Sequence, residues 1–129
     1  MSILKWLEEW YESNCDGDWE HQFGLSLNTL DNPGWCLRLD LNYTLFEDVI
    51  FPEVLIDRSE YDWVRCIKKG SSIECTGGSK NLEEMLSIVK KWMDSNPPDS
   101  VAAEKHMQEV MKVRNFHESV RGGSWSYSG

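Results

Sequence analysis

The chain has 129 residues, of which 40% are hydrophobic and 27% are charged, as is typical of one folded globular domain rather than of a disordered chain. Its 13 basic and 22 acidic residues give a formal net charge of −9, which argues against sequence-independent binding to nucleic acid and against anionic membrane surfaces. The first twelve residues lack the basic and apolar regions of a signal peptide, and no apolar run is long enough to span a membrane. We therefore expect a cytoplasmic protein that binds neither nucleic acid nor membrane.

The acidic excess is concentrated in the first half of the chain. Residues 1–60 contain 13 acidic and 3 basic residues, whereas residues 61–129 contain 9 and 10. A net charge away from zero favours solubility, but an acidic face would also attract a basic partner. The four cysteines show neither a CxxC pair nor a zinc-finger spacing, so we expect reduced thiols and no metal or other cofactor.

The first segments predict a helix followed by a hairpin. Residues 2–14 place apolar side chains at intervals of three and four, the pattern of an amphipathic helix. The segment 15–21, CDGDWEH, breaks this helix. Two alternating segments, 22–30 and 35–41, flank the turn sequence DNPG and predict a β-hairpin, whose first strand has one buried face.

The next segments predict the remainder of an antiparallel sheet. Residues 45–56 are rich in Leu, Phe, Val and Ile, which favours one or two further strands, and residues 57–60 form a polar connection. Residues 61–68 predict a strand, and the SIECT segment at 72–76 predicts a short last one.

Helices follow the predicted sheet. Asn81 and Glu84 form a capping-box pattern at the start of a helix that runs to about residue 96, where two prolines stop it. A third helix is predicted at 101–120, before a mobile Gly/Ser tail at 122–129.

The order of these elements predicts an α+β domain. It has an N-terminal helix, about five antiparallel strands in a meander, and helices packed on one face of the sheet. We assign residues 1–96 to this domain. Residues 97–129 are assigned to a C-terminal helical extension with its tail, an appendage rather than a separate domain.

The densest set of chemically capable side chains is Asp16, Asp18, Glu20 and His21, which surround Trp19. Carboxylates beside a histidine could perform acid–base chemistry or bind a divalent metal. The segment lacks the ligand pattern of a calcium loop, however, and the chain contains no hydrolase or phosphate-binding motif. Catalysis, a purely structural role and recognition of a partner therefore stay open for this loop.

Recognition has a physical argument of its own. Trp19 in DGDWE and Trp63 in EYDW lie among acidic residues, unlike the tryptophans on the apolar stripes. An aromatic ring surrounded by carboxylates suits a basic protein surface, through cation–π contacts and ion pairs. The candidate partner-binding residues are Asp16, Asp18, Trp19, Glu20, His21, Glu60, Asp62 and Trp63.

Several strings together resemble the immunity protein 53 family of small bacterial proteins encoded beside polymorphic toxins. They are LKWLEEWY near the start, CDGDWEHQFG at 15–24, LDNPGW at 30–35, DWxxC at 62–66 and NLEEML at 81–86. The resemblance covers residues 3–95. It implies a non-enzymatic protein that binds and neutralises a cognate toxin domain, and many such toxins are nucleases with basic clefts that an acidic inhibitor could fill.

Three functions are thus weighed on the sequence. The first is neutralisation of a basic toxin domain, which the resemblance favours. The second is a small hydrolase or metal-dependent enzyme that uses Asp16, Asp18, Glu20 and His21. The third is a general interaction module that binds through the predicted third helix and tail. The oligomeric state is left open between a monomer and a weak homodimer.

Overall fold

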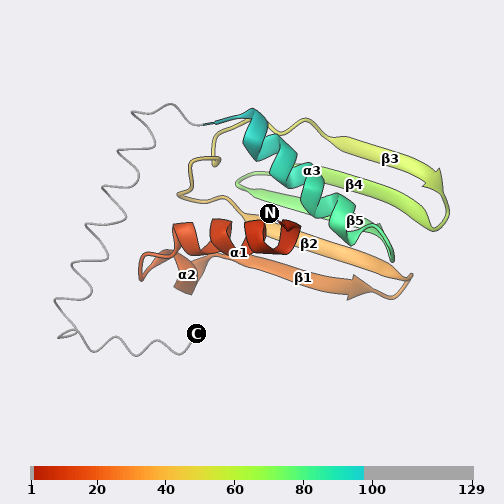
Figure 1. Cartoon of the computed structure of the whole chain (residues 1–129), viewed down its shortest axis with the longest axis horizontal. Coiled ribbons are helices and arrows are strands. Elements are labelled where there is room, and N and C mark those ends of the chain that lie inside the picture. Colours follow the sequence, from red (N-terminus) through yellow and green to blue (C-terminus); the bar gives the residue numbers. More distant parts are fainter. Residues whose placement is uncertain (1, 98–129) are drawn as a thin grey trace.

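The computed structural model describes residues 2–97, which form an antiparallel sheet with helices on one face (Figure 1). The elements in chain order are α1 (Ile3–Asn14), α2 (Trp19–Gln22), β1 (Leu25–Leu30), β2 (Gly34–Asp40), β3 (Val54–Ser59), β4 (Asp62–Lys69), β5 (Ser72–Gly78) and α3 (Leu82–Ser95). The predicted α+β class, N-terminal helix and five-stranded antiparallel sheet are confirmed. The helix predicted at 101–120 and the tail at 122–129 lie outside the described residues.

The strand order in the sheet is β1-β2-β5-β4-β3, and every neighbouring pair is antiparallel. β1 and β2 form the hairpin predicted around DNPG, with Leu30 opposite Gly34. β3, β4 and β5 follow one another as a meander, and β5 rather than β3 pairs with β2. The meander is therefore interrupted once, at the connection from β2 to β3. Within residues 2–97, no helix is long and apolar enough to cross a membrane.

The connection from β2 to β3 departs from the sequence prediction. Residues 41–53 contain no strand, so the strands predicted at 45–56 are confirmed only from Val54 onward. The polar connection predicted at 57–60 is wrong for residues 57–59, because these extend β3.

The apolar residues of this connection pack into the hydrophobic core and do not form a strand. Phe46 and Phe51 pack against Trp92 of α3, with ring centroids 5.3 and 5.1 Å apart. The indole Nε1 of Trp92 donates a hydrogen bond to the carbonyl oxygen of Ile50. These residues are apolar because they are buried beneath a helix. A short apolar segment in the sequence does not show whether it is buried in this way or as part of a strand.

The core lies between the sheet and the two longer helices, which cover the same face of the sheet (Figure 1). The predicted stripe of α3 is buried through Met85, Leu86, Val89, Trp92 and Met93. The sheet contributes Leu37, Leu39, Val64, Cys66, Ile73 and Cys75. α1 packs against the edge of this core with the half-buried side chains of Ile3, Trp6, Leu7 and Trp10. The period-2 pattern of β2 and the period-3.6 pattern of α3 therefore identified the packed faces of these two elements correctly.

The cysteines are all free thiols, and two of them belong to the core. Cys66 on β4 and Cys75 on β5 are direct cross-strand neighbours. The hydrogen bond between the two thiols and burial both raise the pKa of Cys75. This thiol therefore stays protonated at neutral pH, and its role is packing rather than reactivity.

β1 is shorter and more exposed than predicted. α2 takes up residues 19–22, so the strand begins at Leu25 instead of residue 22. Leu27 is 43% exposed because β1 is an edge strand with one neighbour only. The one buried face predicted for this strand is therefore only partly buried, with Leu25 packed against the core and Leu27 exposed.

Candidate partner-binding surfaces

The loop between α1 and α2 is held by its own carboxylates. Oδ1 of Asp16 accepts hydrogen bonds from the backbone N–H groups of Asp18 and Trp19, at 2.8 and 2.9 Å. The side chain of Glu20 accepts from the N–H groups of Asp16 and Gly17, at 3.0 and 2.9 Å. The N–H of Trp19 is one of the donors that the start of α2 leaves without a helical partner, and the other three N–H groups lie in the loop and at the N-cap before it. Gly17 has φ of 100°, a conformation that glycine adopts without strain.

This bonding pattern bears on the enzyme hypothesis. Asp16 and Glu20 direct oxygen atoms at the backbone of their own loop, which is a structural task. Among residues 2–97 no three side chains of His, Cys, Asp or Glu are grouped so that they could hold a metal ion. The hydrogen bonds therefore favour the structural interpretation of Asp16 and Glu20 over acid–base or metal chemistry.

Trp19 is a structural anchor rather than contact surface. The residue is only 5% exposed, and its indole Nε1 donates to the carbonyl oxygen of Asn42 at 2.7 Å. Its ring meets Trp10 edge-on at a centroid distance of 6.0 Å and lies 6.5 Å from Phe23. The prediction that Trp19 faces a partner is wrong, since its ring fills the junction of α1, α2 and the sheet. Asp18 and His21 are exposed beside it.

The acidic surface continues from this loop along the outward side of α1. Glu8, Glu9 and Glu12 are exposed, and the chain contains no Lys or Arg between Lys5 and Arg38. Lys5 pairs with Glu8 at 3.5 Å, whereas Glu9 and Glu12 form no ion pair with another described residue. We call Glu8, Glu9, Glu12, Asp16, Asp18 and Glu20 the α1–α2 acidic segment. It places six acidic residues within residues 8–20, a stretch that contains no Lys or Arg.

The acids at the β3–β4 turn are compensated, in contrast. The guanidinium of Arg58 donates to Asp62 at 2.9 Å and to the carboxylate of Glu84 at 2.6 Å. Hydrogen bonds from Asn81 and Arg58 lower the pKa of Asp62, and bonds from Arg58 and Asn81 lower that of Glu84. The two carboxylates raise the pKa of Arg58. β3, β4 and α3 are thereby joined by ionised side chains.

We predict that this ionic network makes stability depend on pH. A carboxyl whose pKa is lowered by folding stabilises the native state above its unfolded pKa, and this contribution disappears as the pH falls through the folded pKa. The ordinary values are 3.8 for Asp62 and 4.5 for Glu84. The Arg58→Gln variant should therefore have a lower urea midpoint than the parent chain at pH 7. The difference should shrink below about pH 4, and a difference that grew on acidification would contradict the network.

The start of α3 forms a modified capping arrangement. Asn81 is the N-cap, but its side chain makes no cap hydrogen bond to the helix backbone. Instead, Nδ2 donates to Asp62 Oδ1 and to Glu84 Oε1, both at 3.0 Å. The predicted capping box is therefore wrong in its bonds, although it pairs the correct two residues. The amide turns toward the carboxylates because Asp62 of the neighbouring turn lies within its reach.

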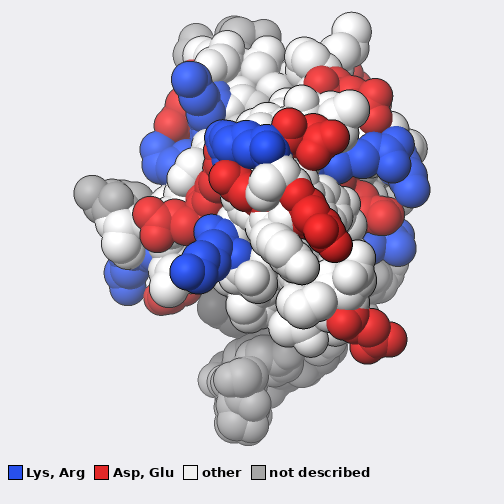
Figure 2. Space-filling view, turned by 90° about the vertical axis from the view of Figure 1, so that its right-hand side faces the viewer, with Lys and Arg blue, Asp and Glu red and all other residues white. Residues whose placement is uncertain are grey.

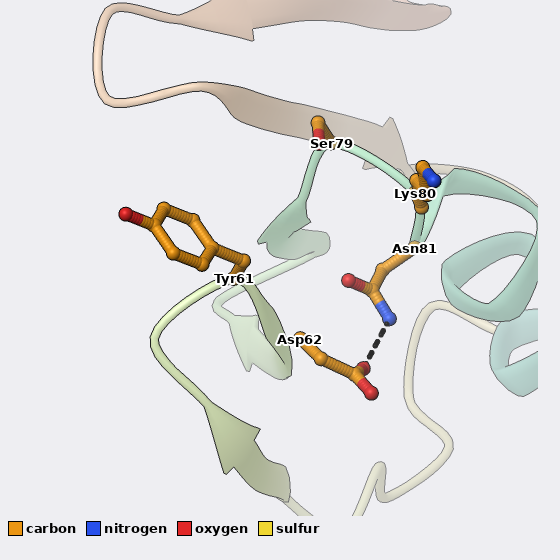
Figure 3. Close-up of a pocket in the computed structure, with 5 residues that line it drawn as sticks. All are labelled: Tyr61, Asp62, Ser79, Lys80 and Asn81. Carbon is orange, nitrogen blue, oxygen red and sulfur yellow. Dashed lines mark hydrogen bonds between the residues drawn. The ribbon is translucent and has the colours of Figure 1, made fainter.

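Asn81 also lines a pocket on the surface (Figure 3). The pocket lies between the β3–β4 turn and the start of α3, and it is lined by Tyr61, Asp62, Ser79, Lys80 and Asn81. In Figure 3 the Asn81 amide nitrogen points at Asp62, whereas its oxygen points away from that contact toward the side of Tyr61. We call this site the Asn81 pocket.

The predicted partner-binding residues do not form one surface. Trp19 contacts Asn42 at one end of the sheet, whereas Asp62 and Asn81 lie beside Gly78 at the other end. The seven residues of β5 span this separation, about 20 Å. Figure 1 shows α2 and the β3–β4 turn at opposite ends of the sheet. The expected single acidic face with two tryptophans is therefore divided in two.

Trp63 lies on the face of the sheet that the helices do not cover. Val64 and Cys66 of the same strand are buried in the core beneath the helices. Because side chains alternate along β4, Trp63 lies on the other face of the sheet. It stands opposite Asp57 of β3 and is half-buried. No helix of residues 2–97 covers this side of the sheet (Figure 1).

Charge differs between the two ends. Figure 2 shows the end that carries the β3–β4 turn, where Lys and Arg alternate with Asp and Glu. A mixed surface of this kind creates no extended field of one sign. The unbalanced acid lies in the α1–α2 acidic segment, which is the part of the described chain best suited to attract a basic surface.

Comparison with known proteins identifies the family. The family model of immunity protein 53 matches residues 4–94, which is most of the chain and nearly all of the described fold. The chain belongs to the immunity protein 53 family. No curated protein and no solved structure matches the sequence. Both the α1–α2 acidic segment and the Asn81 pocket lie within the region that defines immunity protein 53.

Sequence reasoning missed part of the second surface. The sequence predicts Arg58 in a polar connection, and nothing in its local sequence reveals that it joins Asp62 to Glu84 of a distant helix. Asn81 was found, but as a helix cap. The position of Asn81 three residues before Glu84 indicates the contact between these two side chains. The contact between Asn81 and Asp62 depends on the fold, since these residues are distant in sequence.

Proposed function

We propose that this immunity protein binds a cognate bacterial toxin domain in the cytoplasm and neutralises it, without chemistry of its own. Membership of the immunity protein 53 family carries the proposal, because it implies a toxin as the partner. The acidic composition supports a basic toxin domain, such as a nuclease whose cleft binds phosphates. Binding by a monomer or a weak homodimer is compatible with this role.

The α1–α2 acidic segment would attract the toxin. Residues 8–20 contain six acidic residues and no Lys or Arg, so their field extends into solvent over about one Debye length at physiological salt. Such a field raises the rate of association with a basic surface, and salt weakens the effect. Asp18 and His21 are the exposed members of the predicted set at this end, whereas Asp16 and Glu20 contribute charge while they hold the loop.

Short-range contacts would come from the second group of predicted residues. Trp63 offers an aromatic ring on the uncovered face of the sheet, and Glu60 and Asp62 lie next to it in sequence at the β3–β4 turn. Partly desolvated tryptophans are frequent energetic centres of interfaces. A standard interface covers about 800 Å² on each partner. Because α1 covers one face of the sheet and Trp63 lies on the other, a toxin that contacts both groups would have to extend around the edge of the sheet.

A capture experiment tests this proposal. The tagged full chain is used to isolate partners from lysate of the native bacterium at low and at high salt, and mass spectrometry identifies them. We expect one basic toxin domain in stoichiometric amount, and less of it at high salt. If the folded chain isolates no stoichiometric partner at either salt concentration, the proposal is wrong.

A further inference from the structure

The Asn81 pocket contains a buried hydrogen-bond acceptor that the chain itself does not satisfy. Asn81 is 6% exposed, and its Oδ1 has no hydrogen-bond partner. It is the one buried side-chain polar atom left unpaired among residues 2–97. Leaving such an atom without a donor costs about 1–3 kcal/mol, so folded proteins rarely keep one without a reason.

The orientation of this amide is fixed by its neighbours. The other end of the group donates to two carboxylates, Asp62 and Glu84, at 3.0 Å each. A flipped amide would place its oxygen against both carboxylates, which offer only acceptors when ionised. The lowered pKa values of both acids keep them ionised at neutral pH. The oxygen must therefore face away from them, toward the side of Gly78 and Tyr61 (Figure 3).

The Asn81 oxygen packs closely against Gly78. A Cβ atom at Gly78 would lie 2.6 Å from Asn81 Oδ1 and would also collide with the carbonyl oxygen of Tyr61. Glycine is therefore required here, because a side chain at this position would collide with the oxygen and with the backbone of the β3–β4 turn. Tyr61 is 72% exposed, so its side chain is free to move when a group enters from the solvent side.

The chemistry of the lining defines what could enter. Asn81 Oδ1 and the Asp62 carboxylate are acceptors, and the Tyr61 ring provides an aromatic face. Glu60 and Glu83 add exposed negative charge on either side. Arg58 is already bound by Asp62 and Glu84, and Lys80 is the single uncommitted cation in the lining. A planar cation with several donors matches this set better than an anion or an apolar group.

We propose that the Asn81 pocket receives an arginine side chain of the partner protein. One guanidinium N–H would donate to Asn81 Oδ1, another would face the Asp62 carboxylate, and the plane would stack on Tyr61. This inference rests on the proposed function, since it takes the toxin as the source of the arginine. Lys80 would be displaced toward solvent when the arginine enters.

The test uses capped arginine, N-acetyl-L-arginine amide, as a probe in place of the toxin. The full ¹⁵N-labelled chain is titrated with the probe, and the amide signals are followed by NMR. We expect saturable shifts of the Asn81 side-chain amide and of the Gly78 backbone amide, at millimolar probe concentrations. Capped citrulline, which is neutral but of the same shape, should bind about two- to fivefold more weakly, as expected for an exposed charge contact.

Two variants leave Asn81 in place and change the affinity in opposite directions. Asp62→Asn should weaken binding of capped arginine about two- to fivefold, and Lys80→Ala should strengthen it by a similar factor. Asp57→Asn is the matched control, because Asp57 is an exposed acid on the adjoining strand that does not line the pocket. The NMR spectrum of each variant also shows directly whether it is folded.

Two results would overturn the inference. One is the absence of saturable shifts at Asn81 and Gly78. The other is weaker binding in Lys80→Ala, which would mark the pocket as an anion site at the start of α3. Neither result bears on capture of the toxin. Conversely, saturable arginine binding by a chain that captures no toxin would refute the proposed function and leave the pocket standing.

Discussion

Replacing Trp19 with alanine is expected to lower the free energy of unfolding by about 3–5 kcal/mol. The substitution empties a site that is 5% exposed and removes the hydrogen bond from the indole to Asn42. It also removes ring contacts with Trp10 and Phe23 that fix α1 and α2 against the sheet. For a domain of this size the melting temperature should fall by roughly 15 °C or more. Urea unfolding followed by far-UV circular dichroism measures the effect.

Two further variants show whether the loss comes from packing. Trp19→Phe keeps a ring in the site and should lose less stability than the alanine variant. Trp63→Ala removes a half-buried indole from the uncovered face of the sheet, so it should cost less stability than Trp19→Ala. It should nevertheless weaken toxin binding, mainly through faster dissociation. A loss below about 1 kcal/mol in Trp19→Ala would contradict the structural role of this residue.

The second large effect concerns association with the toxin. Converting Glu9, Glu12 and Asp18 to the corresponding amides should slow association about tenfold or more at low salt. The reason is that these exposed carboxylates belong to a stretch, residues 8–20, that contains six acidic residues and no Lys or Arg. The dissociation rate should change little, because steering acts before short-range contacts form. Stopped-flow mixing with the captured toxin domain, over a range of salt concentrations, measures both rates.

A control of equal charge separates local field from net charge. Asp31, Asp57 and Glu83 are exposed and form no ion pair with another described residue. Converting these three to amides changes the net charge by the same amount, but it leaves the α1–α2 acidic segment intact. We expect a much smaller effect on association and a salt dependence close to that of the parent chain. Equal slowing in both triple variants would show that only net charge matters.

The sequence predicted those parts of the fold that regular patterns encode. Alternation identified Leu37 and Leu39 as core positions of β2, and helical spacing identified the buried stripe of α3. The patterns failed where burial had another cause. Phe46 and Phe51 are apolar because they cover Trp92, and no local period distinguishes this from a strand.

The candidate site was predicted less completely, for a physical reason. The sequence groups Asp16 and Glu20 in one candidate site because they are close in sequence. Their hydrogen bonds to the backbone show that both carboxylates hold their own loop in place. The acid-flanked position of Trp19 suggested an exposed ring, and tertiary packing buried it. The Asn81 pocket joins residues from β4 and from the start of α3, and such long-range contacts leave no local pattern.

Protection of living cells tests the central claim most directly. The toxin domain isolated by capture is produced in a sensitive bacterium, alone or together with the full chain, and growth is measured. We predict that the toxin alone stops growth and that the intact chain restores it. The variant with amides at Glu9, Glu12 and Asp18 should protect less well at equal abundance. Growth arrest that persists although both proteins are present and folded would contradict neutralisation by this chain.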